Sequence, residues 1–179
     1  MPFTFTRTEI PDVVLVQARA FGDGRGFFKE TFKRSEFQRF GIQTDFVQDN
    51  VSKSQKNVLR GLHFQKSPYA QGKLVGVMFG KILDVAVDLR KGSKFYGKYV
   101  TRELSDENHC LLWVPPGFAH GFLALEESIV HYKVTTEYNK EAESGIKWND
   151  PYINIAWPVI EPLLSEKDVV WESSSGVYL

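Results

Sequence analysis

The sequence of 179 residues has almost no cysteine, no excess charge of either sign and no long apolar segment. The single cysteine, Cys110, excludes a disulfide within the chain and a zinc site built from several cysteines. Twenty-two basic and twenty-two acidic residues give no formal net charge, which is unlike a nucleic-acid-binding protein. No apolar run approaches the ~18 residues of a membrane-spanning helix, and nothing near Met1 resembles a signal peptide. We therefore expect a cytoplasmic protein that binds neither nucleic acid nor membranes.

Helical periodicity is also nearly absent. Only the segment Ser35–Phe40 predicts a helix. Ser35 and Gln38 have the spacing of a capping box with Ser35 as the N-cap, and Gly41 follows the last turn. Elsewhere apolar and polar residues alternate with the period of two that is typical of strands. We predict strands over Val13–Ala18, Phe27–Phe32, Asn57–Gln65, Lys73–Phe79, Ile82–Leu89, Tyr96–Glu103, Cys110–Val114, Gly121–Ala124 and Ile129–Thr136.

Many short strands at close spacing indicate an antiparallel sandwich or barrel. Gly80–Lys81 predicts a two-residue hairpin between Lys73–Phe79 and Ile82–Leu89. In the second of these strands, the even-numbered residues from Ile82 to Asp88 face one way and the odd-numbered residues the other. The sequence contains no repeat and no linker. We expect one domain over residues 1–179, with an irregular tail from about Pro158.

Two of the four histidines lie in segments that contain a glycine turn. His63 lies in the sequence RGLHFQ, and His120 ends PPGFAH, which has the P-x-G-x-x-H form seen in cupin barrels. A metal-binding cupin would have a second histidine at the position of Gln65, followed by a carboxylate where this chain has Pro68, Tyr69 and Ala70. Two imidazoles without a third strong ligand are a poor site for zinc or iron. We therefore expect no metal.

Seven segments, in order along the chain, resemble the dTDP-4-dehydrorhamnose 3,5-epimerase family. The resemblance implies an all-β cupin or jelly-roll barrel of antiparallel strands with one or two short helices. It also implies a homodimer that exchanges its N-terminal strands, and an enzyme without a cofactor. Its reaction converts dTDP-4-dehydro-6-deoxy-D-glucose to dTDP-4-dehydro-L-rhamnose, a step of dTDP-rhamnose biosynthesis. The segments are FGDGRGFFKE (Phe21–Glu30), VQDN (Val47–Asn50), VLRGLHFQ (Val58–Gln65), YAQGKLV (Tyr69–Val75), VPPGFAHGF (Val114–Phe122), Tyr132–Tyr138 and LLSEKD (Leu163–Asp168).

Epimerisation at C3 and C5 removes a proton beside the C4 ketone and returns one from the opposite face of the ring. It needs a base, an acid across the ring and a donor that stabilises the enolate oxygen. The resemblance implies His63 as the base, Tyr132 as the proton donor and Lys73 as the residue that reaches the C4 oxygen. A carboxylate on one ring nitrogen would fix the tautomer of His63. The resemblance assigns this carboxylate to Asp168, and Asp84 is the alternative.

The resemblance also implies a set of substrate contacts. Arg60 and Lys167 would hold the diphosphate, and Tyr138 would stack near the nucleotide base. Strict alternation puts Arg60 and His63 on opposite faces of one strand, so both enter one site only if Gly61 marks a bulge or twist. The remaining implied contacts are Arg25, Glu30, Gln48, Asp49, Asn50, His120 and Glu143, with Arg25 and Glu30 reaching the site of a neighbouring subunit.

Two other histidines are expected outside the site. His131 faces away from Tyr132 on the same predicted strand, and His109 lies in a polar turn. We expect both at the surface or at an interface. A lysine at the start of a strand is usually solvated, so composition alone gives Lys73 no special status. The alternative role for Tyr132 is ordinary packing within a strand.

Several other functions remain open at this stage. A relative could epimerise only C3 or only C5, or could act as a 3,4-ketoisomerase on a related nucleotide sugar. A metal-dependent cupin oxygenase or isomerase is disfavoured by Gln65 and the missing carboxylate. A non-catalytic sugar-binding cupin would not need the combination of His63, Lys73 and Tyr132.

Overall fold

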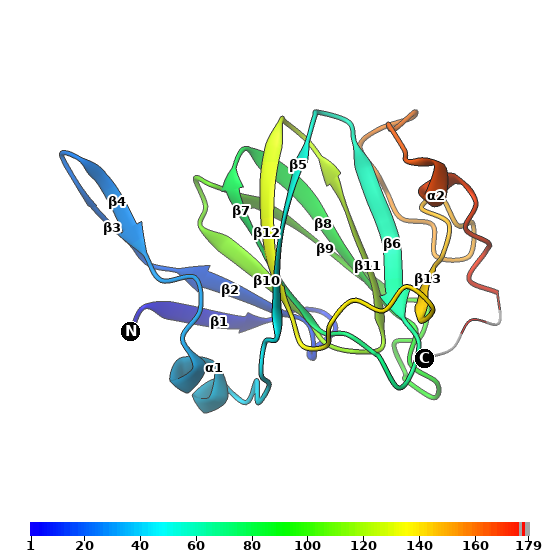
Figure 1. Cartoon of the computed structure of the whole chain (residues 1–179), viewed down its shortest axis with the longest axis horizontal. Helices are drawn as coiled ribbons and strands as arrows, with labels where there is room; N and C mark the ends of the chain where they lie inside the picture. The colour runs from blue at the N-terminus through cyan, green and yellow to red at the C-terminus, as the bar shows by residue number, and fades with distance from the viewer. Residues whose placement is uncertain (176, 178–179) are drawn as a thin grey trace.

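Two antiparallel sheets lie face to face in the computed structural model, which describes residues 1–175 and 177 (Figure 1). One sheet has the order β1 (Phe3–Arg7), β2 (Val14–Ala18), β10 (Cys110–Val114), β7 (Lys73–Phe79), β12 (Ser128–Val134) and β5 (Gln48–Ser54). The other has the order β13 (Glu143–Gly145), β6 (Leu59–Gln65), β11 (Phe118–Ala124), β8 (Lys81–Asp88) and β9 (Tyr99–Ser105). The predicted all-β fold is confirmed, and its two-sheet arrangement is that of a cupin-like jelly roll.

Three smaller elements lie outside these two sheets. Strands β3 (Ala20–Asp23) and β4 (Gly26–Lys29) form a hairpin that projects away from the body of the molecule (Figure 1). Helix α1 (Arg34–Phe40) packs Phe37 edge-on against Phe3 of β1, with ring centroids 5.4 Å apart. Helix α2 (Glu166–Val169) belongs to the C-terminal tail, which runs along the outside of the five-stranded sheet (Figure 1).

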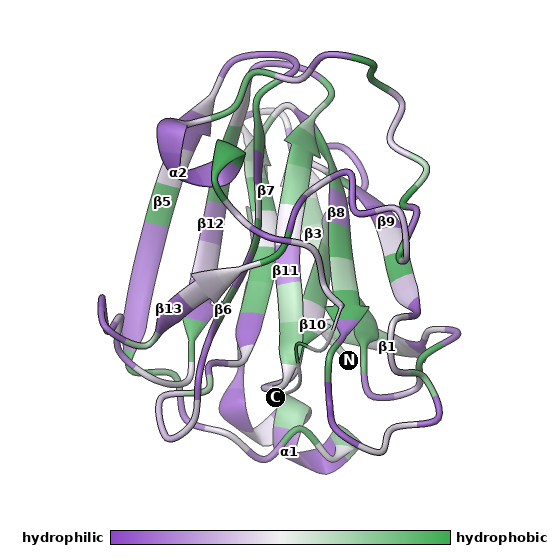
Figure 2. Ribbon diagram, turned by 90° about the vertical axis from the view of Figure 1, so that its right-hand side faces the viewer, coloured by the Kyte–Doolittle hydropathy of each residue, from purple (hydrophilic) through white to green (hydrophobic). Residues whose placement is uncertain are grey.

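The two faces of β8 pack into different hydrophobic clusters, as the alternation predicted. Ile82 and Ala86 point between the sheets, where they meet residues of β7, β10 and β12. Val85, Val87 and Leu89 face outward and are covered by tail residues that include Ile153 and Ile155. In Figure 2 the strands β8 and β10 are among the most apolar, whereas β5 at the edge of its sheet is largely hydrophilic. Because both faces of β8 are covered, its two aspartates, Asp84 and Asp88, are removed from solvent as well.

The hairpin predicted at Gly80–Lys81 is wrong. Strand β7 pairs with β10 and β12, whereas β8 pairs with β11 and β9. Gly80, with φ of +77°, is therefore the corner at which the chain passes from one sheet to the other. A hairpin and a connection between two sheets have the same local sequence signal. A turn glycine between two apolar runs does not show which strands these runs will pair with.

Other local predictions agree with the structure in part. Lys73–Phe79 and Cys110–Val114 are strands with the predicted bounds, and the predicted helix forms and ends at Gly41 in the left-handed conformation. The Ser35 cap is wrong, because the helix begins one residue earlier and Lys33 is its N-cap, without a side-chain hydrogen bond. The strand predicted at Phe27–Phe32 is displaced toward the N-terminus, to β4. The strand predicted at Gly121–Ala124 forms and ends at the predicted residue, but β11 begins three residues earlier.

The sequence pattern missed β1, β3, β5 and β13. Strand β5 reads QDNVSKS and is too polar to show an apolar alternation. The tail beyond Pro158 is irregular apart from α2, and its positions 176, 178 and 179 lie outside the described residues. Within the described part of the chain, no helix has the length and apolar character that crossing a membrane requires.

Candidate active site

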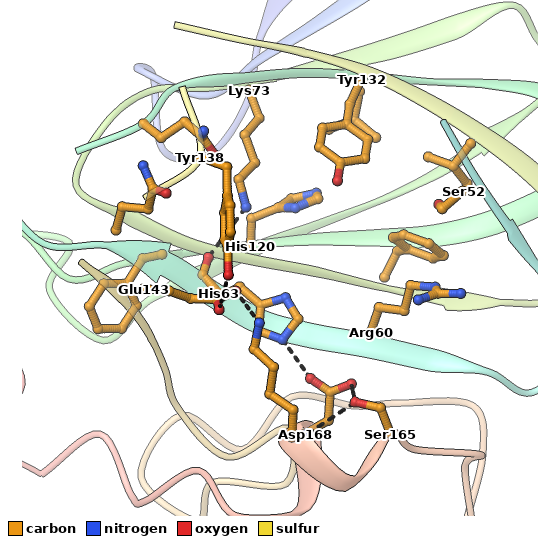
Figure 3. Close-up of a pocket in the computed structure, with 17 residues that line it drawn as sticks. Ser52, Arg60, His63, Lys73, His120, Tyr132, Tyr138, Glu143, Ser165 and Asp168 are labelled. Carbon is orange, nitrogen blue, oxygen red and sulfur yellow. Dashed lines mark hydrogen bonds and ion pairs between the residues drawn. The ribbon is translucent and has the colours of Figure 1, made fainter. Parts of the chain in front are cut away.

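A cavity of about 310 Å³ lies between the two sheets and is bordered by helix α2 (Figure 3). Most of the site residues predicted from the sequence meet here, although they come from distant parts of the chain. The predicted residues that line the cavity are Arg60, His63, Lys73, His120, Tyr132, Tyr138, Glu143, Lys167 and Asp168.

Strand β6 and helix α2 bring His63 and Asp168 together. The His63 Nε2 atom lies 2.5 Å from Asp168 Oδ1, and Ser165, the N-cap of α2, donates its hydroxyl to Asp168 Oδ2 over 2.7 Å. Burial alone would raise the pKa of Asp168, but the hydrogen bonds from His63 and Ser165 outweigh it and lower the pKa. An ionised carboxylate accepts the hydrogen bond from Nε2–H and leaves Nδ1 as the basic nitrogen of the imidazole.

The alternative partner, Asp84, binds a different histidine. Its Oδ1 atom lies 2.8 Å from His120 Nε2, and both side chains are buried. Burial lowers the pKa of His120, although the Asp84 charge opposes that shift. The Oδ2 atom of Asp84 has no hydrogen-bond partner in the described part of the chain. Asp84 therefore does not orient His63, and the sequence alternative is wrong on this point.

The conflict between Arg60 and His63 is resolved at Gly61, as the sequence predicted. Arg60 pairs with Phe122 and His63 with His120, so β6 has one residue more than β11 over this stretch. Gly61 has φ of +132°, and a Cβ atom there would lie 2.6 Å from the Cα of Gly121. Only glycine fits this close approach, and the bulge lets both side chains line the cavity.

The six-stranded sheet contributes Lys73 and Tyr132. Lys73 Nζ lies 3.5 Å from the His63 carbonyl oxygen, and burial lowers the pKa of Lys73 to about 8, against the attraction of Asp84 and Glu143. Burial raises the pKa of Tyr132, so its hydroxyl is protonated at neutral pH. In Figure 3 the Tyr132 hydroxyl and the His63 imidazole point into the cavity from opposite sides.

Three charged or polar side chains form a chain of contacts at the mouth of the cavity. The Tyr138 hydroxyl donates to Glu143 Oε2 over 2.9 Å, and the ammonium of Lys167 forms an ion pair with Glu143 Oε1. The hydrogen bond to Glu143 raises the pKa of Tyr138. The Tyr138 ring is about half exposed, which leaves it free to contact a ligand that enters from solvent.

Gln48 and Asn50 adjoin this mouth without lining the cavity. Gln48 Oε1 accepts the backbone N–H of Tyr138 over 2.9 Å, and Gln48 Nε2 donates to Asn50 Oδ1 over 2.7 Å. Gln65, at the position where a metal-binding cupin has histidine, holds the same region together. Its amide donates to the carbonyl oxygen of Tyr69 over 2.8 Å and accepts from the N–H of Asn139 over 2.7 Å.

Arg60 is held at the other end of the cavity by the six-stranded sheet. Its Nε atom donates to Ser54 Oγ over 3.0 Å, and its Nη2 atom donates to the Lys53 carbonyl oxygen over 3.1 Å. Both acceptors belong to β5, so a side chain from one sheet is fixed by a strand of the other. The guanidinium still borders the cavity, where it can present its donors to an anion.

Three predicted contacts are not brought to this cavity. Arg25, in the β3–β4 hairpin, forms an ion pair with Asp23 and has a side chain that is 90% exposed. Glu30 lies 3.9 Å from the ammonium of Lys33. Asp49 lies on the opposite face of β5 from its neighbours and binds the ammonium of Lys133 over 2.6 Å. The alternation in β5, had that strand been recognised, would have placed Asp49 outside the cavity.

The two remaining histidines lie away from the cavity, as expected. His131 lies 3.5 Å from Asp49 on the outer face of β12, with its side chain 19% exposed. His109 is partly buried near the base of the hairpin, where Lys29 Nζ lies 3.2 Å from its Nδ1 atom. Neither residue lines the cavity.

Sequence reasoning missed several polar residues of the cavity. Ser165 could have been found, because Ser165 and Asp168 have the spacing of a capping box just before the end of the matched segment LLSEKD. Ser52 follows Asn50 by two residues and shares its face of β5. The other missed lining residues are Gln65, Gln71 and the apolar Phe64, Val75, Phe122 and Val130.

Comparisons with known proteins agree with this geometry. The family model described as dTDP-4-dehydrorhamnose 3,5-epimerase matches residues 7–175. A protein of that name from Shigella flexneri is 54% identical over 165 residues, which cover 91% of each chain. One from Methanothermobacter thermautotrophicus is 49% identical over 183 residues, covering 99% of this chain and 98% of the relative.

A solved structure shows the same fold. It is the crystal structure of a dTDP-6-deoxy-D-glucose-3,5-epimerase from Legionella pneumophila in complex with dTDP-4-keto-L-rhamnose. The similarity has a TM-score of 0.94 and 43% sequence identity, and covers 98% of this chain and 94% of that one.

Proposed function

The chain belongs to the dTDP-4-dehydrorhamnose 3,5-epimerase family, and from that premise we propose that His63 and Tyr132 perform the epimerisation across the cavity between the sheets. The reaction converts dTDP-4-dehydro-6-deoxy-D-glucose to dTDP-4-dehydro-L-rhamnose in dTDP-rhamnose biosynthesis. The observation that carries the proposal is that the base and the acid come from opposite walls. His63 belongs to the five-stranded sheet and Tyr132 to the six-stranded sheet.

Proton abstraction is assigned to His63. Nδ1 of the imidazole takes the proton from the carbon beside the C4 ketone, and the electron pair of the C–H bond moves into the enolate. The ionised carboxylate of Asp168, 2.5 Å from Nε2, stabilises the imidazolium that forms. The buried ammonium of Lys73 supplies the positive charge for the enolate oxygen. C3 and C5 both flank C4, so one base and one cation serve both positions.

Reprotonation is assigned to Tyr132. Its raised pKa keeps the hydroxyl protonated until a strongly basic carbanion forms next to it. A proton delivered from the six-stranded sheet reaches the face of the sugar opposite the one that His63 deprotonated, and the carbon is inverted. Every step uses a side chain that lines the cavity, so the proposal contains no metal and no cofactor.

The nucleotide part of the substrate is assigned to the rim of the cavity. Arg60 and Lys167 provide the donors for the diphosphate, and the half-exposed ring of Tyr138 stacks on the base. Asp84 binds Nε2 of His120 and so fixes its tautomer. The other ring nitrogen of His120, Nδ1, contacts the sugar, which is the uncharged part of the substrate. Gln48 and Glu143 fix the position of Tyr138 at the rim by hydrogen bonds, and Asn50 supports Gln48 through the hydrogen bond between their side chains.

We also propose that the protein acts as a homodimer in the cytoplasm. The β3–β4 hairpin exposes Phe27 and Phe28, which are 57% and 68% accessible. Large exposed aromatic side chains grouped on one element are typical of a protein interface. Docking of this hairpin on a second copy would bring Arg25 and Glu30 toward the partner's cavity.

Turnover of dTDP-4-dehydro-6-deoxy-D-glucose in D2O tests the proposed reaction, with the deuterium located by NMR. We expect label at both C3 and C5, and no label with His63→Asn. Label at one carbon would mean a single-centre epimerase, and binding without label would mean a sugar-binding module. Activity lost on treatment with a chelator and restored by a divalent metal would contradict the metal-free mechanism.

A further inference from the structure

The indole ring of Trp171 lies against the imidazole of His63, although it does not line the site cavity. The two ring centroids are 6.1 Å apart and the ring planes meet at 68°, an edge-to-face contact. Trp171 instead borders a second cavity beside the first. We propose that Trp171 is a positioning residue that holds the His63–Asp168 pair in its reactive geometry. This inference rests on the proposed role of His63 as the base.

A glycine provides the space that the indole occupies. Gly145 of β13 pairs directly with His63 of β6. A Cβ atom at position 145 would lie 2.6 Å from Cε2 and 2.7 Å from Cδ2 of Trp171. The same Cβ atom would lie 2.8 Å from the carbonyl oxygen of Leu62 in β6, so any larger residue would displace the indole or the strand that carries His63. The indole nitrogen is buried and has no hydrogen-bond partner among the described residues, so packing places the ring rather than a polar contact.

Trp171 is also connected to the other half of the pair. It follows Asp168 by three residues, just after α2, and Lys167 Nζ lies 6.0 Å from the centre of its ring. Helix α2 has only four residues, which is too short to be stable without tertiary contacts. The position of Asp168 therefore depends on what holds the segment around it.

The segment is held further along by Asp150. Asp150 Oδ2 accepts the hydroxyl of Ser173 over 2.9 Å and the backbone N–H of Ser174 over 2.5 Å. These bonds lie beyond Trp171, so the indole is the anchor nearest to the pair on the C-terminal side of α2, whereas Ser165 holds Asp168 from the N-terminal side. A single hydrogen bond to Asp168 leaves the imidazole free to rock about Nε2, whereas an indole against the ring restricts that motion. A displacement of about 1 Å at a reacting group can cost about a hundredfold in rate.

The test compares Trp171→Ala, Trp171→Phe and Gly145→Ala with wild type. The control is Trp157→Phe, a tail tryptophan whose Nε1 donates to the Trp148 carbonyl oxygen and which lies in the packing of the tail. We expect Trp171→Ala and Gly145→Ala to lower kcat about tenfold to a hundredfold, with little change in KM or in the Kd for dTDP. Trp171→Phe retains an aromatic ring and should recover part of the rate, and Trp157→Phe should match wild type.

Coupling to Asp168 distinguishes positioning from general support of the fold. Residues that act as a unit are not additive, so Trp171→Ala should have a much smaller effect in an Asp168→Asn background than in wild type. If Trp171→Ala lowers kcat by the same factor in both backgrounds, or leaves kcat unchanged, the proposal is overturned. If the Trp171→Ala variant unfolds, the same comparison with the Asp168→Asn background can be made with Trp171→Phe and Gly145→Ala. Solvent exchange that persists in His63→Asn would instead overturn the proposed base, independently of Trp171.

Discussion

Two histidine–aspartate pairs present their histidines to the cavity, and they differ mainly in their surroundings. His63 and His120 are register partners on the neighbouring strands β6 and β11. Asp168, the partner of His63, comes from the C-terminal helix, whereas Asp84, the partner of His120, comes from β8 on the other side of β11. The His63 side chain is 26% exposed and the His120 side chain 8%. Identical residue types thus lie side by side with different access to solvent.

The difference in surroundings assigns different chemistry to the two pairs. Both oxygens of Asp168 have hydrogen-bond partners, which stabilise its negative charge. That charge can in turn stabilise the imidazolium that forms when His63 accepts a proton. Asp84 leaves one oxygen without a partner in the described structure, and burial lowers the pKa of His120. The buried imidazole of His120 resists protonation and is therefore suited to binding a ligand. The imidazole of His63 is more exposed, and its carboxylate partner has both oxygens hydrogen-bonded, so it is suited to accepting a proton. Burial, and not residue type, separates the base from its neighbour.

The largest expected effect comes from removing His63, and the comparison with removal of His120 tests the difference between the pairs. His63→Asn should abolish deuterium incorporation at both carbons, because no other group takes the proton. His120→Asn should bind substrate more weakly but retain exchange at both carbons. NMR of the product formed in D2O measures both variants, and dTDP affinity serves as the control for folding. Equal loss of exchange in the two variants would remove the functional distinction between the pairs.

The next effect concerns the acid that faces the first pair. Tyr132→Phe keeps the ring and removes the hydroxyl, so proton abstraction by His63 should continue while completed epimerisation falls by about 10²–10⁴. Deuterium that washes into the substrate without inversion is the expected signature. Inversion at an undiminished rate would show that the proton comes from another group. The base and the acid would then not be divided between the two sheets.

Lys73 lies between the two pairs and should have a somewhat smaller effect. Loss of a donor to an enolate oxygen costs about 10²–10³ in turnover, so Lys73→Met should slow exchange at both carbons by a similar factor. Because the pKa of Lys73 is lowered to about 8, its ammonium is lost as the pH rises through that value. Wild-type turnover should therefore fall above about pH 8, and Lys73→Met should lack this decrease. A loss confined to one carbon would mean that different groups stabilise the two enolates.

The smallest effect is expected at the rim, away from both pairs. Tyr138→Phe keeps the stacking surface and removes only the hydrogen bond to Glu143. It should change the Kd for dTDP by less than Tyr138→Ala, which removes the ring; an exposed stacking contact contributes about 1–3 kcal/mol. Titration with dTDP compares the two variants. Equal weakening would assign the contribution to the hydroxyl, and the stacking role would be wrong.

Local sequence patterns predicted much of the fold and the composition of the site. The alternation in β8 predicted its two packed faces, and the conflict between Arg60 and His63 predicted the bulge at Gly61. The family resemblance predicted nine of the residues that line the cavity, and eight of these lie within the matched segments. The polar strand β5 was missed, because its burial comes from neighbouring strands and not from its own apolar residues.

The sequence by itself determined the period of the strands and the kinds of side chain available for chemistry. These properties depend on contacts within a few residues, which sterics and alternation control. Only the tertiary structure decided that Gly80 joins two sheets, that Asp168 binds His63 while Asp84 binds His120, and that Trp171 packs over Gly145. The paired groups lie 105 and 36 positions apart in the chain. Such contacts form when strands pair within a sheet and when the C-terminal tail packs on it, and no local pattern contains them.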